Sequence, residues 1–273
     1  MRVFVTGASG WIGSAVVPGA VVASSDGVIH LAFKHDEAFS GNFPAAVDAD
    51  RRAIEVFGEA LAGSGRPLII ASGLAGLPPG HPATENDLPA STSPAGGRTL
   101  SERAVLALAD RGVRSCSVRL PPTVHGHSDT GFVPRLVGIA REHGASGYVG
   151  DGGNHWPAVH RLDAAHLFRL ALEGAPAGSV LHSVAEPGVP TRAIAEAIGR
   201  GLGLPAVSVN PLAAEEHFGW LAGLFALDVQ ASSAHTQELL GWQPTHLALI
   251  EDLDEGHYFT PTPSSSKNSK ALP

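Results

Sequence analysis

The sequence contains a single cysteine, Cys116, so a disulfide framework within one chain is excluded. It has no surplus of basic residues: the formal net charge is −8, which predicts no general attraction to nucleic acid or to an anionic membrane. The longest apolar run, residues 218–227, is about half of the roughly 20 residues that span a bilayer. No charged-then-apolar leader precedes the first strand pattern. These absences predict a cytoplasmic protein without a membrane segment.

Hydrophobic residues make up 44% of the chain, and the 33 glycines fit a folded protein with many loops rather than a disordered one. Short runs rich in β-branched residues alternate with helical patterns, which is typical of a parallel sheet covered by helices. Strands are expected at Arg2–Thr6, Val28–Ala32, Leu68–Ser72 and Arg114–Leu120. Helices are expected around residues 47–61 and 100–110, up to Gly174, and from Thr191 onward. The predicted fold class is therefore α/β.

Two segments have the composition of loops. Residues 77–97 are rich in Pro, Gly, Ser and Thr, which predicts a long surface loop of the kind that often serves as a lid or binding loop. Residues 260–273 are rich in Ser, Pro and Lys, which predicts a disordered tail. From about His125 onward shorter elements mix with loops, so a smaller lobe is expected to follow the sheet.

A glycine motif follows the first strand, in the sequence Thr6-Gly7-Ala8-Ser9-Gly10-Trp11-Ile12-Gly13. In this context the first glycine permits a tight turn, the second lets the backbone approach a pyrophosphate, and the third allows a helix to pack closely on a strand. The N-terminus of the following helix then offers free N–H groups and a partial positive charge to the phosphates. The motif predicts a dinucleotide site, and an ordinary glycine-rich turn is the alternative.

Further segments extend this pattern along the chain: VIHLA at 28–32, LIIASG at 68–73, RLPPTVHG at 119–126, WPAVHRLDAA at 156–165 and LGWQP at 240–244. In this order they resemble the extended short-chain dehydrogenases/reductases, also called NAD-dependent epimerases/dehydratases. The resemblance implies a Rossmann-like parallel sheet, NAD or NADP as cofactor, and a small C-terminal lobe for a small-molecule substrate. A homodimer is compatible with it.

The resemblance also implies a division into domains and a set of cofactor contacts. Residues 1–124 plus about 158–185 are implied to form the NAD(P)-binding domain, and about 125–157 and 186–259 the substrate lobe. Beside the cofactor, in addition to the glycine motif, it places Leu31, Ala32, Ala71, Ser72, Pro121 and Thr123.

The sequence departs from this family in the length of one segment. Family members have a second strand, a helix and a third strand between the glycine motif and the strand that ends in HLA. Here only residues 14–27 separate the two, which is enough for one short helix and a turn. The missing second strand normally carries the residue that reads the adenosine ribose. We therefore expect a sheet shortened on one side, with Arg2–Thr6 at its edge.

The second departure concerns the catalytic tyrosine, which in the family stands four residues before a lysine. Arg98 and Glu102 occupy the corresponding positions, and neither Tyr148 nor Tyr258 has a lysine four residues later. Arg98 and Glu102 are candidates for a replacement acid/base pair, since residues four apart lie on one helix face. The alternative is a capping box formed by Thr99 and Glu102 at a helix start. Because arginine stays charged at any working pH, binding of an anionic substrate suits Arg98 better than proton transfer.

Two other side chains are candidates for the active site. Ser72 stands where the family has its catalytic Ser or Thr, and the alternative is a buried serine that closes a strand. His125 lies in the segment that the resemblance places under the nicotinamide, so it is a candidate acid/base group. The remaining histidines lack the Cys/His spacing of familiar zinc sites, and no metal is predicted.

Three functional interpretations remain open at this point. The first is an NAD(P)-binding oxidoreductase or epimerase/dehydratase-like enzyme that acts on a small polar metabolite. The second is a catalytically silent dinucleotide-binding or sensor protein, which the missing tyrosine and lysine favour. The third is a truncated, non-functional product, which the short segment after the glycine motif favours.

Overall fold

The computed structural model describes residues 1–7, 25–88 and 96–260. Its main sheet has five parallel strands in the order β1-β2-β3-β4-β8. The strands are β1 (Val3–Thr6), β2 (Gly27–His30), β3 (Pro67–Gly73), β4 (Arg114–Leu120) and β8 (Ser179–His182). The four strands expected from the sequence are confirmed, as is the α/β class with a parallel, Rossmann-like sheet.

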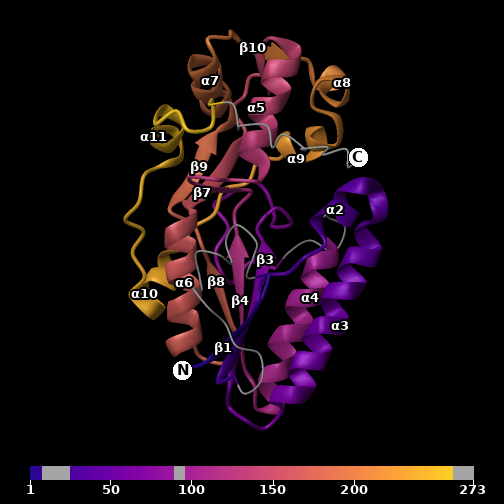
Figure 1. Ribbon diagram of the computed structural model, residues 1–273, viewed down its shortest axis with the longest axis vertical. Coiled ribbons are helices and arrows are strands. Elements are labelled where there is room, and N and C mark those ends of the chain that lie inside the picture. The colour runs from indigo at the N-terminus through magenta and orange to yellow at the C-terminus, as the bar shows by residue number, and fades with distance from the viewer. Residues whose placement is uncertain (8–24, 89–95, 261–273) are drawn as a thin grey trace, which may run out of the picture.

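Helices cover both faces of this sheet (Figure 1). On one face lie α3 (Phe43–Leu61) and α4 (Gly96–Ala107), and on the other lies α6 (Arg161–Gly174). Helix α3 forms because apolar side chains recur at helical spacing and can be buried together: Val47, Ile54 and Leu61 are at most 4% exposed. The central strand β3 is covered on both sides, so its apolar run is continuous rather than alternating.

Strand β1 forms the edge of the sheet among the described residues. Its residues pair in register with β2, from Val3 opposite Gly27 to Thr6 opposite His30. This is the arrangement expected from the short segment after the glycine motif. The prediction of one short helix and a turn in that segment, and the predicted tail, lie mostly outside the described residues.

The first part of the surface loop predicted at 77–97 is mostly exposed, but three of its residues, Leu77, Ala83 and Glu85, are buried. Leu77 and Ala83 are 7% and 0% exposed, and Ala83 forms a parallel bridge to Ala231. The buried carboxylate of Glu85 accepts hydrogen bonds from the N–H and hydroxyl of Thr236, at 2.9 and 2.6 Å. Its last part is helical, because α4 begins at Gly96 rather than near Leu100. Residues 89–95 lie outside the described part.

A second layer of structure lies beyond the carboxyl ends of the main strands (Figure 1). It has its own apolar core, in which Trp156, Ile194 and Phe225 are at most 1% exposed. Its sheets consist of β5 (Thr123–His125), β7 (His155–His160) and β9 (Glu186–Pro190), and of β6 (Ser146–Val149) and β10 (Ala206–Val209). Its helices are α5 (Phe132–His143), α7 (Thr191–Leu202), α8 (Ala214–Phe218), α9 (Ala222–Phe225) and α11 (Leu249–Asp254).

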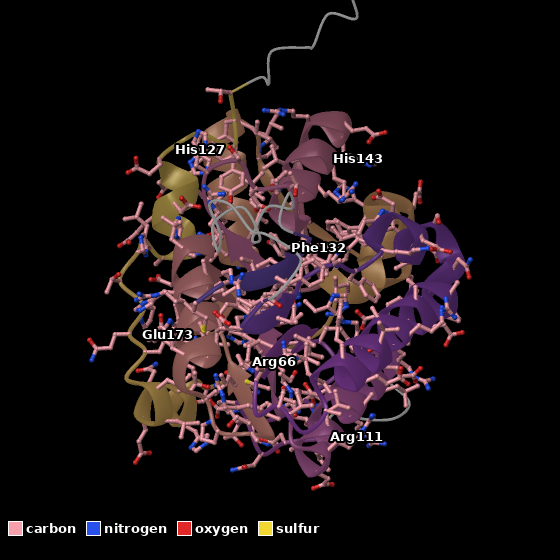
Figure 2. All side chains as sticks on the ribbon, turned by 60° about the horizontal axis from the view of Figure 1, so that its bottom comes forward. Arg66, Arg111, His127, Phe132, His143 and Glu173 are labelled. Atoms are coloured by element: carbon pink, nitrogen blue, oxygen red, sulfur yellow. The ribbon has the colours of Figure 1, made fainter. Side chains whose placement is uncertain are left out.

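The remaining described elements are short, except for one helix of seven residues, α10 (Ala234–Leu240). They are α2 (His35–Glu37), the π-helical segment Ala38–Asn42 and the 3-10 turns Leu108–Arg111, Pro211–Ala213 and Gly219–Leu221. Arg66 and Arg111, which come just before β3 and β4, lie at the end of the molecule away from His127 and His143 (Figure 2). No helix in residues 1–7, 25–88 and 96–260 is long and apolar enough to cross a membrane.

Candidate functional site

The candidate site lies at the carboxyl edge of the five-stranded sheet. Parallel strands end at a common edge, and ligands of open α/β sheets bind in the crevice outside it. The chain leaves β1 at Gly7, β2 at Leu31 and β3 at Leu74. The segments after these strands therefore meet at one place, although they are far apart in the sequence.

Gly7 makes the closest backbone approach at this edge. Its φ is +74°, and a Cβ atom built there would lie 2.9 Å from the Ala32 nitrogen and 3.0 Å from the Leu31 carbonyl carbon. Leu31 N–H also donates to the Thr6 carbonyl at 3.1 Å. Only glycine fits such a turn, which agrees with the role expected for the first glycine of the motif. The other predicted members of the motif, Ala8, Ser9, Gly10, Trp11, Ile12 and Gly13, lie outside the described residues.

Arg98 reaches the same edge from the first turn of α4. Its Nη2 donates a hydrogen bond to the carbonyl oxygen of Ala71, and its guanidinium carbon lies 4.2 Å from the centre of the Phe33 ring. Burial lowers the pKa of Arg98 from its usual value, against the opposing effect of the Asp50 and Glu102 charges. Even so, an arginine stays protonated near neutral pH. The helix thus places a fixed positive charge beside the end of β3.

Ser72 is the neighbouring residue of the strand and is 7% exposed. Among the residues that the structure describes, no hydrogen bond reaches its hydroxyl group. The predicted site residues Ala71, Ser72 and Arg98 are therefore brought together, and the serine hydroxyl is available to a ligand. Beside them, residues Phe33–Glu37 line a surface hollow of about 440 Å³ that opens after β2.

Glu102 lies one helical turn further along α4 and points into the interior. Arg119 of β4 donates to its carboxylate from Nη2 at 2.6 Å and from Nε at 3.0 Å, and Ser117 donates at 2.9 Å. The side chains of Arg119 and Glu102 are 1% and 4% exposed. Thr99 lies inside α4 rather than before it, so the interpretation of Thr99 and Glu102 as a capping box is wrong.

His125 belongs to a different cluster, in the second layer. It is 1% exposed, its Nδ1 lies 3.0 Å from Asp252 Oδ2, and its ring centre lies 5.5 Å from that of His160. His160 stacks on His246, with ring centres 4.7 Å apart. Burial, and then the charges of His125 and His246, lower the pKa of His160 to about 4. Within the described ranges no group of His, Cys, Asp and Glu could hold a metal ion.

The segment after β4 carries the last two predicted cofactor residues. Pro121 and Thr123 are both buried. The Thr123 hydroxyl donates to the Pro157 carbonyl at 2.5 Å, a bond that ties β5 to β7. The Thr123 hydroxyl is therefore already hydrogen-bonded within the protein. The side chain of Pro121 is apolar and could contact a cofactor only through its ring.

Sequence reasoning missed a buried polar chain beneath the glycine turn. His30 Nδ1 lies 2.5 Å from the Thr6 hydroxyl, and its Nε2 lies 3.0 Å from Asp50 Oδ1. Burial alone would raise the pKa of Asp50, but the hydrogen bond from His30 and the charge of Arg98 hold it below its usual value. An ionised Asp50 then accepts from Nε2–H, which leaves Nδ1 to accept from Thr6. These hydrogen bonds between Thr6, His30 and Asp50 hold the end of β1, just before Gly7, against β2 and α3.

Solved structures with the same fold bind dinucleotides. MoeE5 in complex with UDP-glucuronic acid and NAD is 21% identical, with a TM-score of 0.73 over 94% of this chain and 98% of that chain. Human epimerase family protein SDR39U1 with NADPH is 19% identical, with a TM-score of 0.74 over 95% of this chain and 100% of that chain. These likenesses establish the fold. No protein-family model matches the chain.

Two curated yeast proteins are similar over nearly their whole length. Uncharacterized protein C2A9.02 of Schizosaccharomyces pombe is 42% identical, over 95% of this chain and 100% of that protein. Uncharacterized protein YLL056C of Saccharomyces cerevisiae is 39% identical, over 93% and 98%. The alignment with the fission-yeast protein spans 301 positions, more than the 273 residues of this chain, so that relative contains residues without a counterpart here. The chain belongs to the family of these two yeast proteins, and it has the Rossmann-like fold of the NAD(P)-binding epimerases and dehydratases of the extended short-chain dehydrogenase type.

Proposed function

We propose that the chain is an NAD(P)-binding oxidoreductase or epimerase/dehydratase-like enzyme that acts on a small polar metabolite. One observation carries this proposal: at the carboxyl edge of the sheet Arg98 is held on the carbonyl of Ala71, and the next residue, Ser72, has a hydroxyl group without a hydrogen bond among the described residues. At the same edge Gly7 brings the backbone of β1 against Ala32, as expected of the first glycine in a dinucleotide-binding turn. The dinucleotides in the MoeE5 and SDR39U1 structures support NAD or NADP as the cofactor.

Some side chains of this edge would bind the cofactor, and others would bind and orient the substrate. A bound nicotinamide would supply or accept the hydride. Leu31, Ala32 and Ala71 would line the cofactor, and the Ser72 hydroxyl would hydrogen-bond a substrate oxygen. Arg98 would orient the substrate without exchanging protons. Because the sequence has no tyrosine followed four residues later by a lysine, the accompanying proton would come from water.

We assign no acid/base role to Glu102 or His125. The Glu102 carboxylate is neutralised by Arg119 inside the protein. The His125 ring is held by Asp252 in the second layer and is 1% exposed. Neither side chain is arranged to meet a substrate that contacts Ser72 and Arg98.

The test begins with calorimetric titration of the purified chain with NADH and NADPH. A panel of carbonyl compounds and nucleotide sugars then follows, with the absorbance of the reduced nicotinamide as readout. Binding with turnover supports the proposal. Binding without turnover on any substrate supports a silent sensor instead, and absence of binding to both dinucleotides overturns the proposal.

We propose the cytoplasm as the site of action, in line with one buried cysteine and no disulfide. A homodimer is the assembly we would test first, by light scattering at several protein concentrations. A mass of one chain at every concentration would contradict it.

A further inference from the structure

Arg98 is a half-buried cation without a carboxylate partner among the described residues. All 26 acidic side chains of the sequence lie in the described residues, and none forms an ion pair with Arg98 within 4.0 Å. Of the two whose charges act on it, Glu102 is paired with Arg119, and Asp50 is bonded to His30 through Oδ1, while its Oδ2 has no hydrogen-bond partner among the described residues. Residues 8–24, 89–95 and 261–273 contain no Asp or Glu, so no side chain there can neutralise it.

An unpaired charge away from water is unfavourable, so a ligand that supplies the opposite charge is stabilised by pairing with it. The usual structural explanation for a buried arginine is an ion pair inside the fold, as Arg119 illustrates with Glu102. Arg98 has instead one hydrogen bond to a backbone carbonyl and a stacking contact with Phe33. Among the described residues these two contacts leave most of its five N–H groups without a hydrogen-bond partner.

The unused N–H groups match a carboxylate better than a phosphate. A planar guanidinium binds a carboxylate through two parallel hydrogen bonds. A doubly charged phosphate would need a second cation, but the charges that act on the pKa of Arg98 are the negative ones of Asp50 and Glu102. The one titratable cation coupled to it, His35, has a pKa that burial and the charge of Arg98 lower, so it is neutral near pH 7. Lys34 is 62% exposed and is paired with Glu37 at 3.0 Å. The electrostatic environment therefore favours an anion with a single charge.

We propose that Arg98 binds a carboxylate group of the substrate, next to the Ser72 hydroxyl. The substrate class is then a small carboxylic acid that also carries a carbonyl or hydroxyl group. The carbonyl or hydroxyl group of this substrate class rests on the proposed function, because that group is the one that would react. The binding of a carboxylate by Arg98 does not depend on it. It also explains why an arginine, which cannot exchange protons, stands at this position of α4.

The experiment compares acids with their uncharged esters. Pyruvate and acetoacetate, and their methyl esters, are titrated against the full chain by calorimetry, with and without saturating NADH. We expect each acid to bind at least about tenfold more tightly than its ester, since the ester cannot form the charged pair. In the variant R98Q we expect this preference to disappear while the NADH affinity stays within about twofold of wild type.

Two further variants make the result specific. R103Q removes an exposed arginine from the same helix and is expected to leave the preference for acids unchanged. R98K keeps the charge but loses the planar fork, so its acid affinity should fall between those of wild type and R98Q. Thermal unfolding of each variant checks that it is folded. If R98Q does not fold, the affinities of R98K and the wild-type preference for acid over ester still test the proposed carboxylate site.

The outcomes separate this inference from the proposed function. Acid-selective binding without any dinucleotide binding supports the anion site and overturns the proposed function. Dinucleotide binding with equal affinity for acid and ester overturns the anion site alone. Loss of NADH and acid binding in equal proportion in a folded R98Q assigns the arginine to the cofactor and overturns the inference. Displacement of acetoacetate by a lower concentration of inorganic phosphate also overturns it.

Discussion

Arg119 of β4 contacts three other parts of the chain. It pairs with Glu102 of α4, its Nη1 donates to the Asp87 carbonyl at 2.9 Å, and the same atom lies 3.2 Å from His182 Nε2. The Glu102 carboxylate is thus fully used by the fold, at a position where the family resemblance expects a catalytic lysine.

The first prediction concerns this buried pair. Replacing Arg119 by methionine removes the partner of a carboxylate that is 4% exposed, so R119M should lower the free energy of unfolding by about 3–5 kcal/mol. The double variant R119M/E102M should recover a large part of this loss, because no unpaired charge remains. Urea unfolding of the four proteins of the cycle measures both. A double variant no more stable than R119M would show that the carboxylate is not the source of the loss.

The second prediction concerns Asp129, beside Tyr258. Burial raises the pKa of the Asp129 carboxyl to about 7, although the Gly131 N–H and the Tyr258 hydroxyl donate to it. In the unfolded chain the same carboxyl loses its proton near pH 4. Between about pH 4 and pH 7 the folded state therefore binds more protons, and its stability falls as the pH rises through this window.

The variant D129N, which stays neutral, should lack this fall. Its stability relative to wild type should increase from pH 4.5 to pH 7.5 in urea unfolding. D151N is the matched control, because the exposed Asp151 accepts from the N–H two residues later in the same way as Asp129. A constant difference between D129N and wild type across this range would contradict the prediction.

At the scale of elements, the turn after β1 depends on a single glycine. Gly7 and Gly65 both have positive φ, at +74° and +65°, but only a Cβ at Gly7 would meet backbone atoms within 4 Å. Both G7A and G65A lose about 1–2 kcal/mol from the left-handed conformation. G7A should lose at least about 2 kcal/mol more, because β1 and β2 must move apart.

Denaturant unfolding of G7A and G65A measures this difference, and G65A provides the control for the conformation alone. We also expect G7A to weaken NADH binding, because the shifted strand end carries the start of the glycine motif. Equal destabilisation by the two substitutions would mean that the turn has room for a side chain.

Elements with a regular pattern were predictable from the sequence, and contacts between distant segments were not. The apolar runs of β3 and β4 and the helical spacing in α3 follow from local pattern alone. One overlooked signal was local as well: Asp50 lies three residues after Val47 and four before Ile54, on the apolar stripe of α3. A carboxylate on such a stripe indicates a buried partner, which here is His30.

The errors have a common physical cause. Residues 77–85 have the composition of a surface loop and several of them are exposed, yet Ala83 and Glu85 are buried by a segment about 150 residues later, through the bridge of Ala83 to Ala231 and the bonds of Glu85 to Thr236. Glu102 fits a capping box by spacing, but its partner lies on β4. Composition and spacing describe the neighbours along the chain, whereas burial depends on what the fold places alongside.

At the scale of the whole molecule, the sheet ends at β1 within the described residues, and the fission-yeast relative aligns over more positions than this chain has. In dinucleotide-binding folds of this kind, an acidic residue about 20 positions after the glycine motif reads the ribose 2′-hydroxyl, or a nearby arginine accommodates a 2′-phosphate. Between Gly7 and Gly27 the only charged side chain is Asp26. It accepts a hydrogen bond from Arg2 N–H at 2.7 Å, at the amino end of β1, far from the cofactor edge.

The last prediction is that the chain does not distinguish the two dinucleotides. Because that segment contains no arginine for the 2′-phosphate, and its one carboxylate, Asp26, is bonded to Arg2 at the amino end of β1, the dissociation constants of NADH and NADPH should agree within about threefold. Calorimetric titrations at one fixed salt concentration measure them, and repeating them at higher salt shows whether the extra phosphate contributes through charge alone. A preference of tenfold or more for either cofactor would mean that another part of the chain has taken over the reading of the adenosine ribose.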